Sequence, residues 1–371
     1  MSSARAKDLP KRLSSKLLLG PADFGPTAEG LEVIGVFNPG AARVGDEIVL
    51  LVRVAQGATS KEPGWVHSPR SDLEGGHVRY DVDRIEIHPD DDGDHRKPLT
   101  VTGHRRLAFI SHLELVRLSP DGYEVKAIER PDALFGRTST EEYGVEDARI
   151  TQVGNEYLIT YVSVSSTMGV ATSLMTTRDF RSFERRGIIF PTENKDVVIF
   201  PEKIGGAWFA LHRPVENINI RPLAMMAAES PDLVHWGRHR YVLGCASEPG
   251  WYSRRIGAGP PPVRTEEGWL TIFHGVRPRA EGGPIGKYSA GALLTALDEP
   301  WRPVGISEEP FMFPEEEWEI SGYVGDVVFP TGAVADLDDP DRLHVFYGCA
   351  DSSVAAAAFS IKEIVAHLKR L

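Results

Sequence analysis

Some short runs of this 371-residue chain combine carboxylates, cations and turn residues, the types that do acid–base chemistry and bind anions. In Tyr143–Arg149, Glu146 and Asp147 are adjacent. Because neighbouring strand residues point to opposite faces, this spacing alone does not make a catalytic carboxyl pair. In a turn both side chains could face one pocket; a surface turn in which Arg149 pairs with a carboxylate is the alternative.

Three more polar residues stand in or beside apolar runs. Arg53 interrupts the run 50–54, and an arginine inside a strand needs a partner or a ligand because burying an unpaired charge is costly. Asp351 follows an apolar run and a small-residue turn, a position typical of a pocket-facing carboxylate or of a β-turn. Asn38 precedes Pro39, which indicates either turn chemistry or a ligand contact.

The middle of the chain is basic although the whole chain is acidic. Residues 195–279 contain 11 Lys and Arg against 8 Asp and Glu, a local charge of +3, whereas the whole chain carries −12. This island indicates an anionic ligand, and one small anion fits better than a polyanion; pairing with the acidic surface is the alternative. Its candidate residues are Lys195, Glu202, Arg213, Arg255 and His274.

Composition excludes several classes of protein. The hydrophobic share of 42% and the charged share of 25% exclude wholesale disorder. The net charge argues against a general nucleic-acid or anionic-membrane binder. With two cysteines and no His-Glu-x-x-His motif, we expect no disulfide framework, metal site or organic cofactor. We see no membrane-span-length apolar run and no signal peptide, so we expect a soluble cytoplasmic protein.

The expected elements are mostly strands. Several apolar runs are continuous rather than alternating, which indicates strands covered on both faces. The runs are 48–54, 107–118, 157–164, 208–212, 223–228, 269–276, 290–296, 343–347 and 354–359. Apolar residues at the spacing of an amphipathic helix are clear only in the C-terminal tail.

A weak internal repeat organises these strands. The anchors Tyr157, Trp208 and Trp269 are 51 and 61 residues apart. Repeats near fifty residues that each form a small antiparallel sheet predict a β-propeller, with a long sandwich as the competing interpretation. Similar units begin at Ile48, Leu107 and Leu343.

We therefore predict an all-β, five-bladed β-propeller over residues 31–360, with a short N-terminal arm (1–30) and a C-terminal helix (361–371). The first and last partial units are expected to share one blade, because an open edge strand would be a liability. The two chain ends outside the repeats are expected to be solvated, or to join subunits of a homo-oligomer.

Taken in order, the motifs resemble glycoside hydrolase family 130, the β-mannoside phosphorylases and related β-mannosidases. The resemblance covers about residues 35 to 355 and implies a five-bladed propeller with its active site at the mouth of the central channel. The matching phrases are 38–40 with Arg53, 144–149, 195–196, 200–203, 211–214, 257–262, 273–275, 329–332 and 347–351.

The resemblance also implies roles for individual residues. Asp147 matches the catalytic acid, which in the phosphorylases is thought to protonate the glycosidic oxygen through the sugar's 3-hydroxyl. The positions that hold the mannosyl ring are Asn38, Arg53, Glu146 and Asp351. The positions that bind phosphate are Lys195, Arg213, Arg255 and His274.

The implied reaction is an inverting phosphorolysis. Inorganic phosphate, the co-substrate, attacks a terminal β-mannosyl unit and gives α-mannose 1-phosphate. The acid must be protonated, and we expect a site low in water to raise its pKa. A phosphorylase places cations where phosphate binds, because the nucleophile brings its own charge.

Two other functions stay open at this point. A β-mannosidase of the same fold, acting on β-1,2-linked mannosides, would need a carboxylate base near the attacking water, and Glu202 and Asp351 are the candidates. A non-catalytic propeller used as a binding platform is the other. Ala148 and Ser289 depart from common family residues and leave the phosphate site and the linkage open, while the Lys195-Asp196 phrase favours β-1,2.

Overall fold

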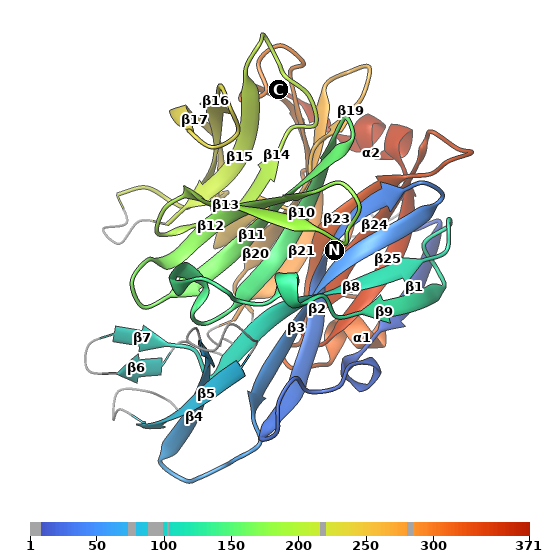
Figure 1. Ribbon diagram of the computed structural model, residues 1–371. Helices are drawn as coiled ribbons and strands as arrows, with labels where there is room; N and C mark the ends of the chain where they lie inside the picture. Colours follow the sequence, from blue (N-terminus) through green and yellow to red (C-terminus); the bar gives the residue numbers. More distant parts are fainter. Residues whose placement is uncertain (1–8, 73–78, 88–98, 102–103, 216–219, 280–284) are drawn as a thin grey trace.

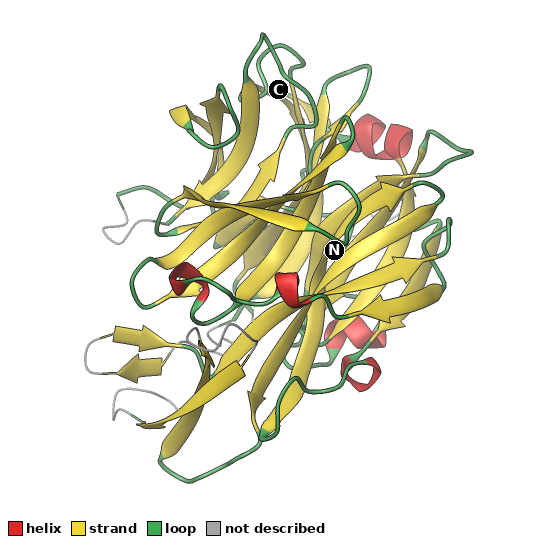
Figure 2. Cartoon of the chain, viewed as in Figure 1, coloured by secondary structure: helices red, strands yellow, loops and turns green. Residues whose placement is uncertain are grey.

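The computed structural model describes residues 9–72, 79–87, 99–101, 104–215, 220–279 and 285–371. Almost all of its regular structure is strand, as Figure 2 shows. Five sheets, four of four strands and one of six, surround a common centre (Figure 1). The all-β, five-bladed propeller expected from the sequence is therefore confirmed.

Within each blade, consecutive strands pair antiparallel, and the first strands of most neighbouring blades contact one another at the centre. From the inside outwards the blades are β2 (Leu31–Val44), β3 (Glu47–Ala58), β8 (Phe109–Leu118) and β9 (Val125–Glu129); β10 (Val145–Val153), β11 (Glu156–Ser165), β12 (Gly169–Thr177) and β13 (Phe183–Phe190); β14 (Asn194–Ile199), β15 (Trp208–Pro214), β16 (Ala224–Ser230) and β17 (Gly237–Gly244); β18 (Arg255–Ala258), β20 (Trp269–Arg277), β21 (Lys287–Thr295) and β22 (Pro303–Ile306); and β23 (Val328–Ala335), β24 (Arg342–Cys349), β25 (Ser353–Ser360) and β1 (Ser14–Leu19). The short β19 (Val263–Arg264) also pairs with β20.

The anchors Tyr157, Trp208 and Trp269 all lie at the start of the second strand of a blade, in β11, β15 and β20. The separate units expected at Ile48 and Leu107 are wrong, because β3 and β8 are neighbours in one blade. Two hairpins inserted between them hide that pairing in the sequence and project to one side of the propeller (Figure 1). They are β4 (Trp65–Asp72) with β5 (Arg79–Glu86), and β6 (Leu99–Val101) with β7 (His104–Arg106).

The ring closes by sharing of the fifth blade, as expected, but the strand that closes it is β1 and not the unit that begins at Ile48, which lies in the first blade. β1 pairs antiparallel with β25, so part of the segment 1–30, expected to be an arm, closes the ring. This closure leaves β25 paired on both edges.

The C-terminal helix α2 (Ile361–His367) is shorter than the predicted 361–371. It ends because Leu368 is extended, and β26 (Lys369–Arg370) then pairs with β22 of the fourth blade. A second short helix, α1 (Glu317–Ile320), lies between β22 and β23. Single 3₁₀ turns occur at Pro21–Asp23, Asp132–Leu134 and Ser139–Glu141.

Blade stacking explains the continuous apolar runs. In β3, Ile48 through Val52 are fully buried although successive side chains point to opposite faces. The two faces of a blade's inner strands are therefore covered by the two blades on either side of it. Among the described residues, no helix is long and apolar enough to cross a membrane.

Candidate active site

The inner strands of three blades are irregular where they reach the centre. The pairing register slips in β2, β10 and β14. Within each slip one residue has a left-handed backbone: Asn38 (φ 50°), Asp147 (φ 51°) and Asp196 (φ 55°). Asn and Asp adopt this conformation more readily than other side chains, and bulges re-aim side chains next to active sites. Three blades thus turn a polar residue towards one place.

That place is a cavity of about 520 Å³. It is lined by nine of the ten candidate residues from the sequence: Asn38, Arg53, Glu146, Asp147, Lys195, Arg213, Arg255, His274 and Asp351. Aromatic side chains form much of the remaining wall: Phe37, Phe109, Tyr288, Tyr323 and Phe329.

Glu202, expected as a catalytic base, lies elsewhere. Its side chain is 47% exposed, and its Oε1 accepts a hydrogen bond from Arg264 Nη1 at 2.9 Å. β14 ends at Ile199, so Glu202 belongs to the connection towards β15 and not to the strand that carries Lys195 into the cavity. The structure therefore does not bring Glu202 to the cavity where a catalytic base was expected.

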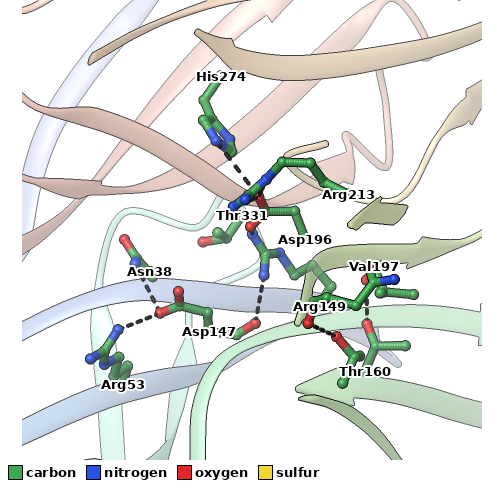
Figure 3. A network of polar contacts seen from close by, with 12 residues as sticks. Asn38, Arg53, Asp147, Arg149, Thr160, Asp196, Val197, Arg213, His274 and Thr331 are labelled. Atoms are coloured by element: carbon green, nitrogen blue, oxygen red, sulfur yellow. Dashed lines mark hydrogen bonds and ion pairs between the residues drawn. The ribbon is translucent and has the colours of Figure 1, made fainter. Parts of the chain in front are cut away.

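One wall of the cavity, the carboxylate side, is built on the buried Arg53 of β3. Its Nη1 donates to Asp147 Oδ1 at 2.9 Å and its Nη2 to Glu146 Oε1 at 2.8 Å. Asn38 Nδ2 also donates to Asp147 Oδ1 at 2.9 Å (Figure 3). The bulge at Asp147 lets adjacent carboxylates face the same arginine, which a regular strand would forbid.

The ionisation of Asp147 differs from the expectation. Burial would raise its pKa, but Arg53, Arg149, Lys195 and the Asn38 hydrogen bond together hold it below the usual range. The expected rise in the pKa of Asp147 is therefore wrong for the free site. Asp147 Oδ2 accepts no hydrogen bond from the described residues and is available to a ligand.

Asp351 completes the carboxylate side from the turn after β24. Ala350 and Asp351 both have a left-handed backbone, with φ of 49° and 47°. Burial, and then the charges of Asp147 and Glu146, raise the pKa of Asp351 to about 6 against the opposing effect of Arg53. Asp351 is thus the carboxyl that retains a proton most readily.

The opposite wall, the cation side, is organised by Asp196. Its Oδ1 accepts from Arg149 Nη2 at 3.0 Å, and its Oδ2 accepts from Arg213 Nε and Nη2 at 3.0 and 2.8 Å. Burial opposes ionisation, but Arg213, His274 and Arg149 lower the pKa of Asp196 far below its usual value. Asp196 is fully engaged and fixes the Arg213 guanidinium at the edge of the cavity.

His274 lies 3.8 Å from Asp196 Oδ2 and packs against Phe329. Burial lowers its pKa to about 3 despite Asp196, so the ring is neutral at neutral pH. A Cβ at Gly257 would collide with both Asp196 and His274, which explains the glycine in this motif.

Two further cations line the cation side. Arg255 donates from Nη1 to the Tyr288 hydroxyl at 3.3 Å. Lys195 has no hydrogen-bond partner among the described residues, and its charge lowers the pKa of Asp147, Asp196 and Asp351 alike. Lys195 therefore lies between the two walls.

Arg149 joins the walls beneath the cavity. It is 2% exposed, and its Nη1 donates to the Asp147 carbonyl at 3.0 Å while its Nη2 holds Asp196 (Figure 3). The sequence interpretation gave Asp196 no role and paired Arg149 only with a surface carboxylate. Both could have been recognised from the sequence, because Arg149 and Asp196 are charged residues within apolar strands and such residues need a buried partner.

This arrangement suits a neutral polyol and a small anion bound side by side. Free carboxylate oxygens and an aromatic wall bind hydroxyls and sugar faces, and fixed guanidinium groups bind oxyanions. Within the described ranges, no cluster of three or more His, Cys, Asp or Glu side chains could hold a metal ion.

Comparison with known proteins identifies the family. Residues 109–370 match glycoside hydrolase family 130, described as β-1,4-mannooligosaccharide phosphorylase. The chain is 37% identical to a β-1,2-mannobiose phosphorylase of Listeria innocua over 364 residues, covering 96% of this chain and 98% of that protein. It is 33% identical to a 1,2-β-oligomannan phosphorylase of a Thermoanaerobacter species over 259 residues, 69% of this chain and 81% of that protein.

A solved structure of the Listeria innocua β-1,2-mannobiose phosphorylase with β-1,2-mannobiose superposes with a TM-score of 0.85. The two chains are 36% identical, and the match covers 94% of this chain and 96% of the other. Together with the ordered motifs, these similarities show that the chain belongs to glycoside hydrolase family 130 and is a glycoside phosphorylase that acts on β-mannosides.

Proposed function

We propose that this enzyme is an inverting phosphorylase that cleaves the terminal unit of a β-1,2-linked mannoside and releases α-mannose 1-phosphate. The observation that carries the proposal is the opposition of two walls: a carboxyl with a free oxygen, Asp147, faces a guanidinium fixed by Asp196. The relatives described as β-1,2-mannobiose and 1,2-β-oligomannan phosphorylases support the β-1,2 linkage.

The mannosyl unit would occupy the carboxylate side. Asp147 Oδ2 and the Asp351 carboxyl offer hydrogen-bond acceptors to hydroxyls, while Arg53 and Asn38 keep Asp147 in place. The Arg53 Cζ lies over the Phe37 ring, 4.7 Å from the ring centroid, and both residues line the cavity. A fixed acceptor set selects the orientation of a sugar because unpaired hydroxyls are costly to bury.

Phosphate would bind on the cation side, where Lys195, Arg213 and Arg255 supply charge and neutral His274 supplies a directed hydrogen bond. In the step, a phosphate oxygen bonds to the anomeric carbon from the face opposite the leaving group, and the bond to the glycosidic oxygen breaks. The leaving oxygen takes a proton from Asp147, by way of a sugar hydroxyl. The proton brought by hydrogen phosphate restores the carboxyl, so atoms and charge balance.

Phosphate binding would also prepare the acid. In the free site the cations Lys195 and Arg149 help keep Asp147 ionised. A bound dianion offsets those charges and raises the pKa of Asp147 towards the range that a general acid needs. Acid and nucleophile thereby become competent together, and inorganic phosphate is the one co-substrate required, without a further cofactor.

The test is to incubate the protein with β-1,2-mannobiose with and without phosphate and to identify the products by nuclear magnetic resonance. Phosphate-dependent release of α-mannose 1-phosphate is expected. Free mannose formed at a phosphate-independent rate would instead establish a hydrolase. Turnover of β-1,4-mannobiose in preference to the β-1,2 isomer would overturn the linkage alone.

A further inference from the structure

The basic N-terminal segment contributes one arginine that is largely buried. The Arg12 side chain is 9% exposed, although it precedes the first strand. Its Nη1 donates to Glu319 Oε1 at 2.7 Å, and its Nη2 donates to the Phe313 carbonyl at 3.0 Å. Its Nε lies 3.0 Å from Glu315 Oε1. Arg12 therefore anchors the segment to α1, about 300 residues away in the chain.

Its main partner, Glu319, is a fully buried carboxylate. Oε1 also accepts from the Tyr347 hydroxyl at 2.7 Å, and Oε2 accepts the backbone N–H groups of Glu315 and Glu316 at 2.9 and 3.1 Å. Among the described residues, Arg12 is the one cation paired with this carboxylate. Removing it would leave a buried charge without a counterion, which is strongly unfavourable.

Backbone hydrogen bonds connect Glu319 to the carboxylate side of the active site. Its carbonyl accepts the Val327 N–H at 3.0 Å, and the Val327 carbonyl accepts the Ala350 N–H at 3.0 Å. The Ala350 carbonyl in turn accepts the Val324 N–H at 3.0 Å. One hydrogen-bonded unit thus connects Glu319 to the turn that carries Asp351.

Two more contacts lock this unit. The Tyr323 N–H donates to Ser352 Oγ at 2.7 Å. Gly322 packs so closely on Ala350 that an added Cβ would collide with it. Hydrogen bonds and close packing therefore join residues 321–327 and 349–352 into one body, and three of their side chains line the cavity: Tyr323, Val324 and Asp351.

We propose that Arg12 is a positioning residue for the mannosyl site: by neutralising Glu319 it holds the body formed by residues 321–327 and 349–352 in the place where Asp351 meets the sugar. The N-terminal segment is then part of the active-site architecture. This inference rests on the proposed function for its kinetic readout. The cation-side residues Lys195, Arg213 and His274 stand on β14, β15 and β20 and share none of these hydrogen bonds. Arg255 of β18 is linked to the body only through Tyr288, whose N–H donates to the Asp326 carbonyl at 3.0 Å and whose hydroxyl accepts from Arg255. The cation side should therefore be affected less than the mannosyl site.

The experiment compares Arg12→Gln, Arg12→Lys, Glu319→Gln and the double variant Arg12→Gln/Glu319→Gln. The matched control is Lys16→Gln, since Lys16 is a cation of the same segment whose Nζ donates to the Tyr123 carbonyl at 2.7 Å, on another loop. For each, kcat and KM are measured for β-1,2-mannobiose at saturating phosphate and for phosphate at saturating mannobiose. Near-ultraviolet circular dichroism confirms folding.

For Arg12→Gln we expect kcat/KM for the mannoside to fall by about tenfold to a hundredfold, as for a displacement of about 1 Å at a reacting centre. KM for phosphate should change much less, because Tyr288 is the connection from this body to the cation side. The double variant should recover much of the loss, because no unpaired buried charge remains. Arg12→Lys should lie between Arg12→Gln and the wild type, and Lys16→Gln should match the wild type.

Equal losses for mannoside and phosphate, or no loss in folded Arg12→Gln, would overturn the inference. If Arg12→Gln does not fold, the Arg12→Lys variant decides by the same comparison. If the wild type shows no phosphorolysis, the proposed function fails on its own. Calorimetric titration of mannose then tests Arg12 separately, with weaker binding to the Arg12 variants expected and equal binding contradicting the inference.

Discussion

The two walls of the cavity use the same local device for opposite purposes. Asp147 of β10 and Asp196 of β14 are both aspartates at positive φ inside a bulge of an inner strand. Both carboxylate oxygens of Asp196 accept hydrogen bonds, from Arg149 and Arg213. In Asp147 one oxygen accepts from Arg53 and Asn38, and the other accepts no hydrogen bond from the described residues. The side chain of Asp351 accepts no hydrogen bond from the described residues. The three aspartates thus form a series, from Asp196 with two paired oxygens through Asp147 with one to Asp351 with none.

The two aspartates share their backbone geometry and differ in how many of their oxygens are paired; we propose that this pairing separates a structural carboxylate from a reactive one. A carboxylate saturated by two guanidinium groups is held ionised and cannot exchange a proton near neutral pH. A carboxylate with a free oxygen can respond when a nearby anion changes the local charge. Substitution of an aspartate with a free oxygen should mainly reduce turnover, whereas substitution of the fully paired Asp196 should mainly reduce the stability of the fold.

The largest effect is expected for Asp147→Asn. The amide oxygen still accepts from Arg53 and Asn38, so the fold persists, but no proton can be delivered to the leaving oxygen. We expect turnover to fall by about 10²–10⁴-fold, the usual worth of a general acid. Initial rates of mannose 1-phosphate release from β-1,2-mannobiose measure it.

A stability control accompanies that measurement. The urea midpoint of Asp147→Asn should lie close to that of the wild type, since Arg53 keeps Glu146 as its partner. Retained turnover in a folded variant would show that the free oxygen of Asp147 is not the proton donor, and would favour a binding platform or another acid.

Asp196→Asn should reverse the pattern. Two buried arginines lose their shared anion, and removing one partner from such a cluster costs about 3–5 kcal/mol of the free energy of unfolding. Equilibrium unfolding in urea gives this difference directly. Phosphate affinity should fall as well, because Arg213 is no longer fixed. A variant as stable as the wild type, with only kcat reduced, would place Asp196 among the reacting groups.

Much of this site could be predicted from the sequence because its motifs are local. The phrase Gly144–Arg149 and the apolar strands beginning at Tyr157, Trp208 and Trp269 carry their own signals of type and spacing. Nine candidate residues therefore fall in one cavity.

The rest depends on pairing across blades. Whether Glu146 and Asp147 share a face follows from a bulge, which is a property of the register between two strands. Glu202 belongs to the same sequence segment as Lys195, but β14 ends at Ile199, before Glu202. The insertion of β4 to β7 between β3 and β8 likewise separates in sequence what pairs in space. The ionisation of Asp147 depends on charges from three blades and could not be read locally.

Asp351→Asn should stabilise the ligand-free protein by an amount that grows as the pH rises. Because burial raises the pKa of Asp351 from 3.8 to about 6, the folded protein binds more protons than the unfolded chain in that window and loses stability as pH rises through it. The Asp351→Asn variant has no carboxyl at this position and therefore does not lose this stability as the pH rises. We expect it to match the wild type near pH 4 and to exceed it by up to about 3 kcal/mol at pH 7.

Urea unfolding of both proteins at several pH values tests this prediction, since the difference between them cancels groups that they share. A stability difference independent of pH would show that Asp351 has the same pKa in the folded and in the unfolded chain. Turnover of the variant should be reduced at every pH, because the mannosyl unit loses an acceptor, so gain in stability and loss of activity are expected together.

The smallest effect is expected for Glu202→Gln. This carboxylate is half exposed and paired with Arg264, itself 58% exposed, and such surface pairs contribute about 0–1 kcal/mol. Turnover, KM for phosphate and KM for the mannoside should all equal those of the wild type. Should Glu202→Gln instead abolish a phosphate-independent release of mannose, the connection after β14 would have to fold back into the cavity during the reaction. The contrast between the two walls would then describe only the resting enzyme.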